Sequence, residues 1–108
     1  MSQNHNDGSG VEFIGMIQGQ KVSEIHAAQG PAIDRDYVRA FAQAHEQAGF
    51  DRVLVPHHST GPDATLTVAY AASVTERIHF MLAHRPGFVA PTLAARQFAS
   101  LDQFSGGR

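Results

Sequence analysis

Three short apolar segments alternate with three helical patterns along this chain, and this alternation constrains the fold more than any other feature. The apolar segments are residues 11–17, 53–56 and 78–83. The second of them has no polar–apolar alternation at all, which is typical of a parallel strand covered on both faces. Between the segments, apolar residues recur at helical spacing. The predicted order is β-α-β-α-β-α, which requires right-handed crossovers and a parallel sheet.

The expected helix ends follow from residues with known terminal preferences. We expect Asp34 to cap the first helix, because its carboxylate accepts hydrogen bonds from the unpaired amides of the first turn. Gly49 fits the end of that helix, and Pro62 and Pro91 fit the first positions of the second and third. The expected inner faces are Leu66, Ala69, Tyr70 and Ser73 in the second helix, and Ala94, Phe98, Leu101 and Phe104 in the third.

The composition is that of one soluble domain: 108 residues, 43% hydrophobic and 17% charged, which is enough apolar material for a core. The formal net charge of -2 argues against a nucleic-acid-binding surface. The absence of cysteine excludes disulfides, thiolate metal sites and a cysteine nucleophile. No apolar run is long enough to span a bilayer, and the first ten residues lack the features of a signal peptide. We therefore expect a cytoplasmic protein that is not bound to membranes.

The domain boundaries follow from the same pattern. Residues 1–10 are polar and are interpreted as a flexible tail, and residues 11–108 form the folded part. Three strands that are apolar on both faces leave two unpaired edges and one uncovered face, which favours aggregation. Because the chain ends where a fourth strand is expected, we interpret it as the first three βα units of a TIM (β/α)8 barrel, incomplete in this chain. Such a barrel has about 250 residues when complete. A small open α/β domain is the alternative.

Candidate site residues lie after the strands, because ligands of parallel α/β folds bind at the carboxyl ends of the strands. His57 and His84 are expected to end neighbouring strands and to share one rim. Imidazole transfers protons near neutral pH, donates to an oxyanion or binds metal. Arg85 has a planar fork that suits a phosphate or a sulfonate. The alternatives are loop histidines that bond only to backbone, and an arginine paired with a carboxylate.

Other site types have weaker support. His57 and the adjacent His58 would point to opposite sides if extended, so a metal site is the weaker hypothesis. Gly15 and Gly19 fit neither the dinucleotide fingerprint nor the P-loop. Asp63 is placed in the first turn of the second helix, where a favourable charge–dipole interaction competes with a ligand role. These residues predict an α/β domain with a polar rim, but they do not define a reaction.

The last third of the chain carries a more specific pattern. It reads Arg-Pro at 85–86, Pro-Thr-x-Ala-Ala-Arg at 91–96 and Leu-Asp-x-x-Ser-x-Gly-Arg at 101–108. This pattern resembles the third βα unit of the bacterial-luciferase-like flavin monooxygenases, and it is most similar to their alkanesulfonate monooxygenase branch. Residues 49–56 resemble the second strand of that family and its lead-in. The resemblance extends over residues 11–108, and it is weak in the long loop at 19–33.

The resemblance implies a TIM-type barrel that binds reduced FMN (FMNH2) at the carboxyl ends of its strands. A separate NAD(P)H-dependent flavin reductase would supply the FMNH2. The flavin would react with O2 and oxygenate a small organosulfur substrate, in this branch often a sulfonate or sulfone carbon. The flavin carries the difficult chemistry, and the protein supplies orientation and a dry site. A homo-oligomer is expected when the barrel is complete, with neither nucleic acid nor membrane as a partner.

The resemblance also implies roles for individual residues. Asp63 matches an acidic residue near the flavin, and Ala83 and His84 match the strand end that backs the isoalloxazine ring. A cis peptide bond within residues 81–83 would be typical. Alkanesulfonate members have a cysteine where this chain has Gly61, and a histidine where it has Gln18. The catalytic candidates are His57, His84 and Arg85, the cofactor-binding candidates are Asp63, Ala83 and His84, and His58 also lines the rim.

The first hypothesis is therefore the amino-terminal part of an FMNH2-dependent monooxygenase acting on alkanesulfonates or related organosulfur compounds. An F420-dependent oxidoreductase of the same fold is one alternative. The other is a non-catalytic chain, either a truncated remnant or an assembly module that pairs through its open strand edges.

Overall fold

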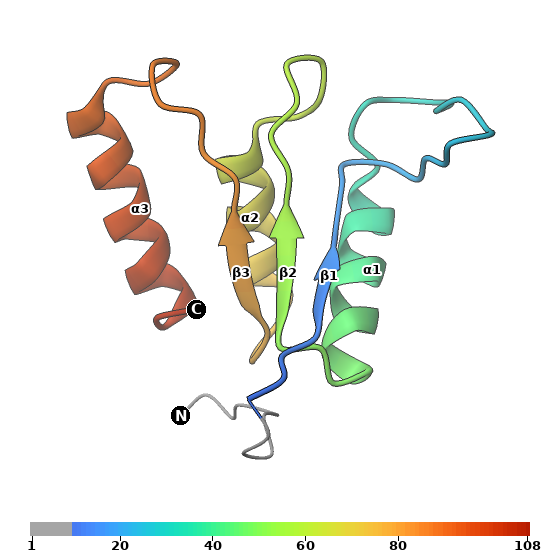
Figure 1. The fold of residues 1–108 in the computed structure, drawn as a ribbon, viewed down its shortest axis with the longest axis horizontal. Coiled ribbons are helices and arrows are strands. Elements are labelled where there is room, and N and C mark those ends of the chain that lie inside the picture. Colours follow the sequence, from blue (N-terminus) through green and yellow to red (C-terminus); the bar gives the residue numbers. More distant parts are fainter. Residues whose placement is uncertain (1–9) are drawn as a thin grey trace.

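Three strands and three helices alternate in the computed structural model, which describes residues 10–108 (Figure 1). The elements are β1 (Ile14–Met16), α1 (Arg35–Gln47), β2 (Arg52–Val55), α2 (Ala64–Ser73), β3 (His79–Leu82) and α3 (Pro91–Ser105). The strands form a parallel sheet in the order β1-β2-β3. The predicted element order and the parallel sheet are confirmed. Apart from Gly10, the predicted tail at 1–10 lies outside the described residues.

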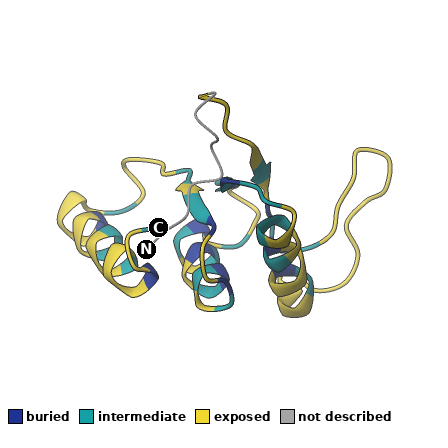
Figure 2. Cartoon of the chain, turned by 90° about the horizontal axis from the view of Figure 1, so that it is seen from below, coloured by how far each residue is buried: buried dark blue, intermediate teal, exposed yellow. Residues whose placement is uncertain are grey.

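All three helices lie on one face of the sheet, and the buried residues gather between the two layers (Figure 2). This covered face includes the in-register residues Gly15, Val53 and Phe80. The core consists of small and β-branched side chains, which let the helices approach the sheet closely. Its buried members are Ile17, Ala42, Val53, Val55, Ala64, Val68, Ala71 and Ile78.

The opposite face of the sheet has no covering layer in the described part of the chain. Because successive strand side chains point to opposite faces, Met16, Leu54 and Met81 lie in register on this uncovered face. Met16 is 45% exposed and Met81 is 42% exposed. The predicted apolar, uncovered face is thus confirmed. It has the form expected of three neighbouring βα units of a barrel, whose strands pack on one another inside.

The helix ends agree with the sequence in three cases, among them Gly49, which follows α1 with a φ of +86°, and they correct it in one. Asp34 caps α1, because its Oδ1 accepts a hydrogen bond from the backbone N–H of Tyr37 at 3.1 Å. The third helix begins at Pro91, as predicted. The prediction that Pro62 begins the second helix is wrong. Asp63 is the N-cap of α2, and its Oδ1 accepts from the N–H of Leu66 at 2.9 Å.

The predicted inner faces of α2 and α3 need correction. In α2 the buried residues are Ala64, Val68 and Ala71, whereas Leu66 is 69% exposed. Most residues of this helix are apolar or small, so their spacing alone does not select one face. In α3 Ala94 is buried as expected, but Phe104 is 91% exposed. Phe98 is half-buried and Leu101 packs against the core, so the predicted inner face of α3 is wrong only at Phe104.

Arg108 fastens the end of α3 to its neighbours. Its guanidinium donates to the carbonyl of Ala72 at 3.0 Å and to the hydroxyl of Thr75 at 3.1 Å. The backbone N–H of Arg108 donates to Ser105 Oγ, and the carbonyl of Arg108 accepts from the N–H of Phe80 at the edge of β3. The serine and arginine of the Leu-Asp-x-x-Ser-x-Gly-Arg pattern are therefore structural residues in this chain.

Candidate functional site

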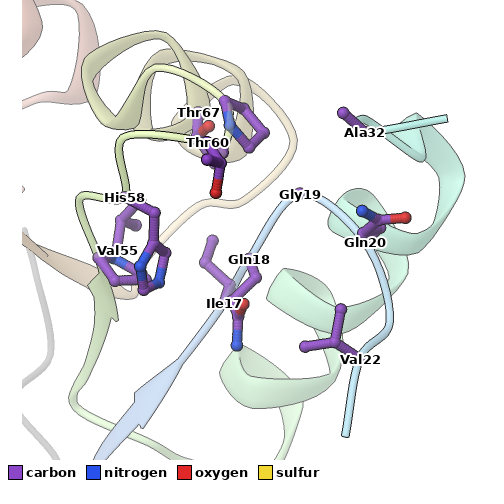
Figure 3. Close-up of a pocket in the computed structure, with 13 residues that line it drawn as sticks. Ile17, Gln18, Gly19, Gln20, Val22, Ala32, Val55, His58, Thr60 and Thr67 are labelled. Carbon is purple, nitrogen blue, oxygen red and sulfur yellow. The ribbon is translucent and has the colours of Figure 1, made fainter. Parts of the chain in front are cut away.

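A small pocket lies at the carboxyl ends of β1 and β2, between the loops that follow these strands (Figure 3). Its volume is about 170 Å³. The lining residues are Ile17, Gln18, Gly19, Gln20, Val22, Ala32, Val55, Pro56, His58, Thr60, Gly61, Pro62 and Thr67. This is the edge of the sheet at which the sequence predicted a ligand site. Pockets that enclose drug-sized ligands measure roughly 300–1,000 Å³, so this one suits a much smaller molecule.

Gly19 makes the wall of the pocket possible. A Cβ added at this residue would lie 2.5 Å from Cγ of Pro62 and 2.8 Å from the carbonyl oxygen of Ala32. Only glycine permits that approach of the two loops. The carbonyl of Gly19 also accepts a hydrogen bond from the N–H of Asp34 at 2.7 Å. This hydrogen bond holds the two ends of the long loop at 20–33 together, and the first residues of the loop line the pocket.

Three polar side chains of the pocket make no hydrogen bond to another described residue. They are the amide of Gln18, the imidazole of His58 and the hydroxyl of Thr60, which surround a common space in Figure 3. The hydroxyl of Thr67, in contrast, donates to the carbonyl of Asp63 at 2.8 Å. The pocket therefore offers hydrogen-bonding groups in mostly apolar surroundings, an arrangement that orients a small polar ligand.

His57 and His84 follow the neighbouring parallel strands β2 and β3, as predicted. Each imidazole contacts a different phenylalanine, however. The ring of His57 lies 5.4 Å from that of Phe88, in the loop after β3, and the ring of His84 lies 5.1 Å from that of Phe98 on α3. The structure thus places His84 against a helix. His58 lines the pocket and His57 does not. The sequence could not predict this difference, because the orientation of adjacent residues in a turn does not follow from their spacing.

Arg85 and Asp63 differ in the contacts that their side chains make. Arg85 is exposed, and its guanidinium carbon lies 5.4 Å from the centre of the Phe88 ring. The carboxylate of Asp63 serves as the N-cap of α2 and faces the groove between α1 and α2, on the helix side of the sheet. The prediction that Asp63 lies inside the first turn is wrong by one position. Its role near a flavin stays a prediction.

Ala83 continues the pairing of β3, because its N–H donates to the carbonyl of Val55 at 3.0 Å. The alternation of side chains along the strands then assigns Gln18, Pro56 and Ala83 to the uncovered face, one step beyond Met16, Leu54 and Met81. No cis peptide bond occurs among the described residues, so the prediction of one within residues 81–83 is wrong.

Two titratable groups with resolved pKa shifts, Glu46 and His79, lie away from the pocket, near the amino ends of the strands. Partial burial raises the pKa of the Glu46 carboxyl, but hydrogen bonds from the backbone N–H groups of Arg77, Ile78 and Glu76 outweigh that effect and lower it. Partial burial, followed by the positive charge of Arg52, lowers the pKa of His79. Neither group lines the pocket, and their shifts make the stability of the fold depend on pH.

Within residues 10–108, no three histidine, aspartate or glutamate side chains gather closely enough to hold a metal ion. None of the described helices is long and apolar enough to cross a membrane. Neither observation restricts the chemistry of a bound organic cofactor.

The family comparison covers nearly the whole described structure. The profile of the luciferase-like monooxygenases matches residues 11–108. That family has a TIM-barrel fold, with which three parallel strands and three alternating helices are consistent. Its members generally use a reduced flavin (FMN or F420) and O2 with a small-molecule substrate. Because the profile matches nearly the whole chain, the chain belongs to the luciferase-like monooxygenase family.

Proposed function

We propose that this chain forms part of the active site of an FMNH2-dependent monooxygenase that acts on alkanesulfonates or related small organosulfur compounds. The observation that carries the proposal is the pocket between the loops after β1 and β2, which lies at the edge where barrel enzymes bind their substrates. Its size suits a small substrate and not the three-ring system of a flavin.

The residues at this edge fit a reduced flavin beside the pocket. A flat ring system needs a surface of small side chains, which Pro56 and Ala83 supply at the carboxyl edge of the uncovered face. The amide of Gln18 borders both this surface and the pocket, and it is available to hydrogen-bond a ring heteroatom. Bound reduced flavin would supply the two electrons that activate O2 for transfer of one oxygen atom.

The chain's own side chains would then bind the substrate and orient it. In this proposal His58 and Thr60 hydrogen-bond the polar end of the substrate, while Ile17, Val55 and Pro62 exclude water from the pocket. Gly19 keeps the two loops together, so that the pocket stays formed without ligand. His57, His84 and Arg85 stay the candidates for proton transfer and charge stabilisation at the rim. We keep Asp63, Ala83 and His84 as the candidates beside the flavin.

The test is turnover with a supplied reduced cofactor. The protein is incubated with an NAD(P)H-dependent flavin reductase, FMN, O2 and ethanesulfonate, and sulfite release is measured. Sulfite release that requires reduced FMN supports the proposal. Turnover with reduced F420 and none with FMNH2 would assign the chain to the F420-dependent oxidoreductases instead. His84→Ala is expected to lower kcat/KM more than the matched His79→Ala, and equal effects would contradict the rim assignment.

A second candidate function is favoured by the exposed apolar side chains on the uncovered face, among them Ile14, Met16 and Met81. A non-catalytic assembly module would use this face, or the open strand edges, to pair with a partner. A defined oligomer with no turnover under either cofactor supports the module, whereas a polydisperse aggregate contradicts it.

A further inference from the structure

Three side chains from two adjacent loops meet at the carboxyl edge of the sheet. His57 follows β2, and Arg85 and Phe88 follow β3. The two loops are neighbours, because Val55 and Leu82 are in register and the N–H of Ala83 donates to the carbonyl of Val55. The ring of Phe88 contacts both of the other groups, with 5.4 Å to the imidazole centre and 5.4 Å to the guanidinium carbon.

The imidazole of His57 is incompletely satisfied in this arrangement. Its Nε2 atom is buried and has no hydrogen-bond partner among the described residues. A buried nitrogen without a partner costs free energy, and such atoms therefore call for a specific explanation. The atom belongs to one of the two histidines that the sequence places at neighbouring strand ends.

The ring of Phe88 packs against this imidazole at an interplanar angle of 65°. It is 64% exposed, so its displacement would empty no core. The preceding Gly87 has a φ of +97°, and nothing lies within 4 Å of the position of its missing Cβ. Glycine adopts backbone conformations that other residues disfavour, so this turn has more freedom to rearrange at Gly87 than at any residue with a side chain. Because both the imidazole of His57 and the guanidinium of Arg85 contact the ring of Phe88, displacing this ring would open the space between the two groups.

We propose that Phe88 is a displaceable cover over a two-group site for a tetrahedral oxyanion, formed by His57 Nε2 and the guanidinium of Arg85. With Phe88 moved aside, the arginine fork donates to two oxygens of the anion. An N–H at Nε2 donates to a third oxygen, since a histidine nitrogen is a donor when it carries the proton. The anion thus supplies the partner that Nε2 lacks.

Two sources share this chemistry, the sulfonate of a substrate and the phosphate of a flavin nucleotide. The inference depends on the proposed function only for naming these sources, because anion binding itself needs neither flavin nor O2. Failure of the two proposals is therefore distinguishable. If no anion binds, sulfite release still tests the proposed function. If the protein is inactive, the titration still tests anion binding.

The experiment follows the side-chain 15N signals of the histidines while ethanesulfonate or inorganic phosphate is titrated into the protein. We expect the Nε2 signal of His57 to shift on saturation. Arg85→Gln is expected to weaken binding about tenfold, because it removes a charge-assisted bidentate contact. Phe88→Ala is expected to tighten binding several-fold, since the closed conformation no longer competes with the anion.

The matched controls are Arg39→Gln on α1 and His26→Gln in the long loop, both of which are exposed and distant from this cluster. They should bind the anion like the parent protein. Because Phe88 is exposed, its replacement should leave the unfolding midpoint unchanged, which separates loss of the cover from loss of the fold.

Tighter binding of ethanesulfonate than of phosphate assigns the site to the substrate, and the reverse order assigns it to the phosphate of the flavin. Either result supports the oxyanion site. The proposal is overturned if neither anion shifts His57 in the Phe88→Ala variant. It is also overturned if Arg39→Gln weakens binding as much as Arg85→Gln.

Discussion

The two faces of the sheet contrast sharply, although the same three strands make both. On the covered face Val53 is 0% exposed and Val55 is 2% exposed. On the other face Met16 and Met81 keep 45% and 42% of their surface exposed. Both faces are apolar, so side-chain chemistry does not distinguish them. The difference arises because three helices pack on one side only, and in a closed barrel the second face is the interior.

The contrast also separates stability from function. Most residues that hold the fold together face the helices, whereas the pocket and the loops with His57 and Arg85 lie at the carboxyl edge; only Ile17 and Val55 belong to both the core and the pocket wall among the described residues. Barrel enzymes divide these tasks in the same way, with stability in the layers and chemistry at one rim. Changes to the two faces should therefore have measurably different consequences.

The largest difference is expected between two neighbouring residues of the first strand segment. Ile17 is 0% exposed under the helices, and Ile17→Ala should lower the free energy of unfolding by about 2–4 kcal/mol through cavity formation. Met16→Ala, on the uncovered face, should lower it by less than about 1 kcal/mol. Urea unfolding at constant m-value measures both. Equal losses would mean that the uncovered face is packed in solution.

The second largest effect is expected at Gly15, which lies under the imidazole of His45. A Cβ at Gly15 would collide with that ring, so Gly15→Ala should cost about 1–3 kcal/mol of stability through overpacking. Adding His45→Ala should recover part of this loss in a double-mutant cycle. The control is Gly61→Ala, whose nearest contact would be an ordinary 3.4 Å. A cycle without coupling between Gly15 and His45 would contradict the collision.

A smaller effect is expected at Glu46, which joins α1 to the turn before β3. Its Oε2 accepts from the N–H groups of Glu76, Arg77 and Ile78 at 2.9, 2.6 and 2.9 Å. Glu46→Gln should cost about 1 kcal/mol, because neutral acceptors form weaker hydrogen bonds than a carboxylate. The control is Glu24→Gln in the exposed loop. A loss no larger than that of the control would show that the three contacts add nothing to stability.

The pH dependence of stability tests the same group. The folded pKa of Glu46 is lowered from its ordinary 4.5, so its contribution is fully present above that value and is lost as the pH falls through the folded pKa. His79 has a pKa lowered from 6.5, so it adds a separate loss that begins as the pH falls below 6.5. Glu46→Gln should reduce the pH dependence of the free energy of unfolding below pH 4.5, and it should leave the loss of stability near pH 6.5 in place. Unfolding midpoints measured across this range check the assignment.

The smallest change in stability is expected on the uncovered face itself. Met81→Lys should alter the free energy of unfolding by no more than about 0.5 kcal/mol, because the side chain is 42% exposed. It should nevertheless reduce self-association, since a charge interrupts the apolar row that Met81 forms with Met16 and Leu54. Sedimentation at several protein concentrations measures this, with Met81→Leu as control. Identical association of the two variants would exclude this face as the contact.

The sequence predicted those features of the fold that depend on local rules. Asp34 caps α1 and Pro91 begins α3 because both preferences depend on the backbone of a single turn. The inner face of α2 was predicted wrongly, since a helix of mostly small and apolar residues offers several equivalent faces. The candidate site was predicted in part. The two loops are at the expected edge, but His58 lines the pocket while the Nε2 of His57 is buried.

The sequence by itself determined the alternation of strands and helices, the parallel sheet and the family to which the chain belongs, because each follows from residue types at fixed spacing. The tertiary structure alone decided which face of each strand is buried, that His45 occupies the space above Gly15, and that Phe88 contacts both His57 and Arg85. Those contacts join residues far apart in the chain or depend on the course of a turn. Their formation is governed by the packing of whole elements, which local spacing does not encode.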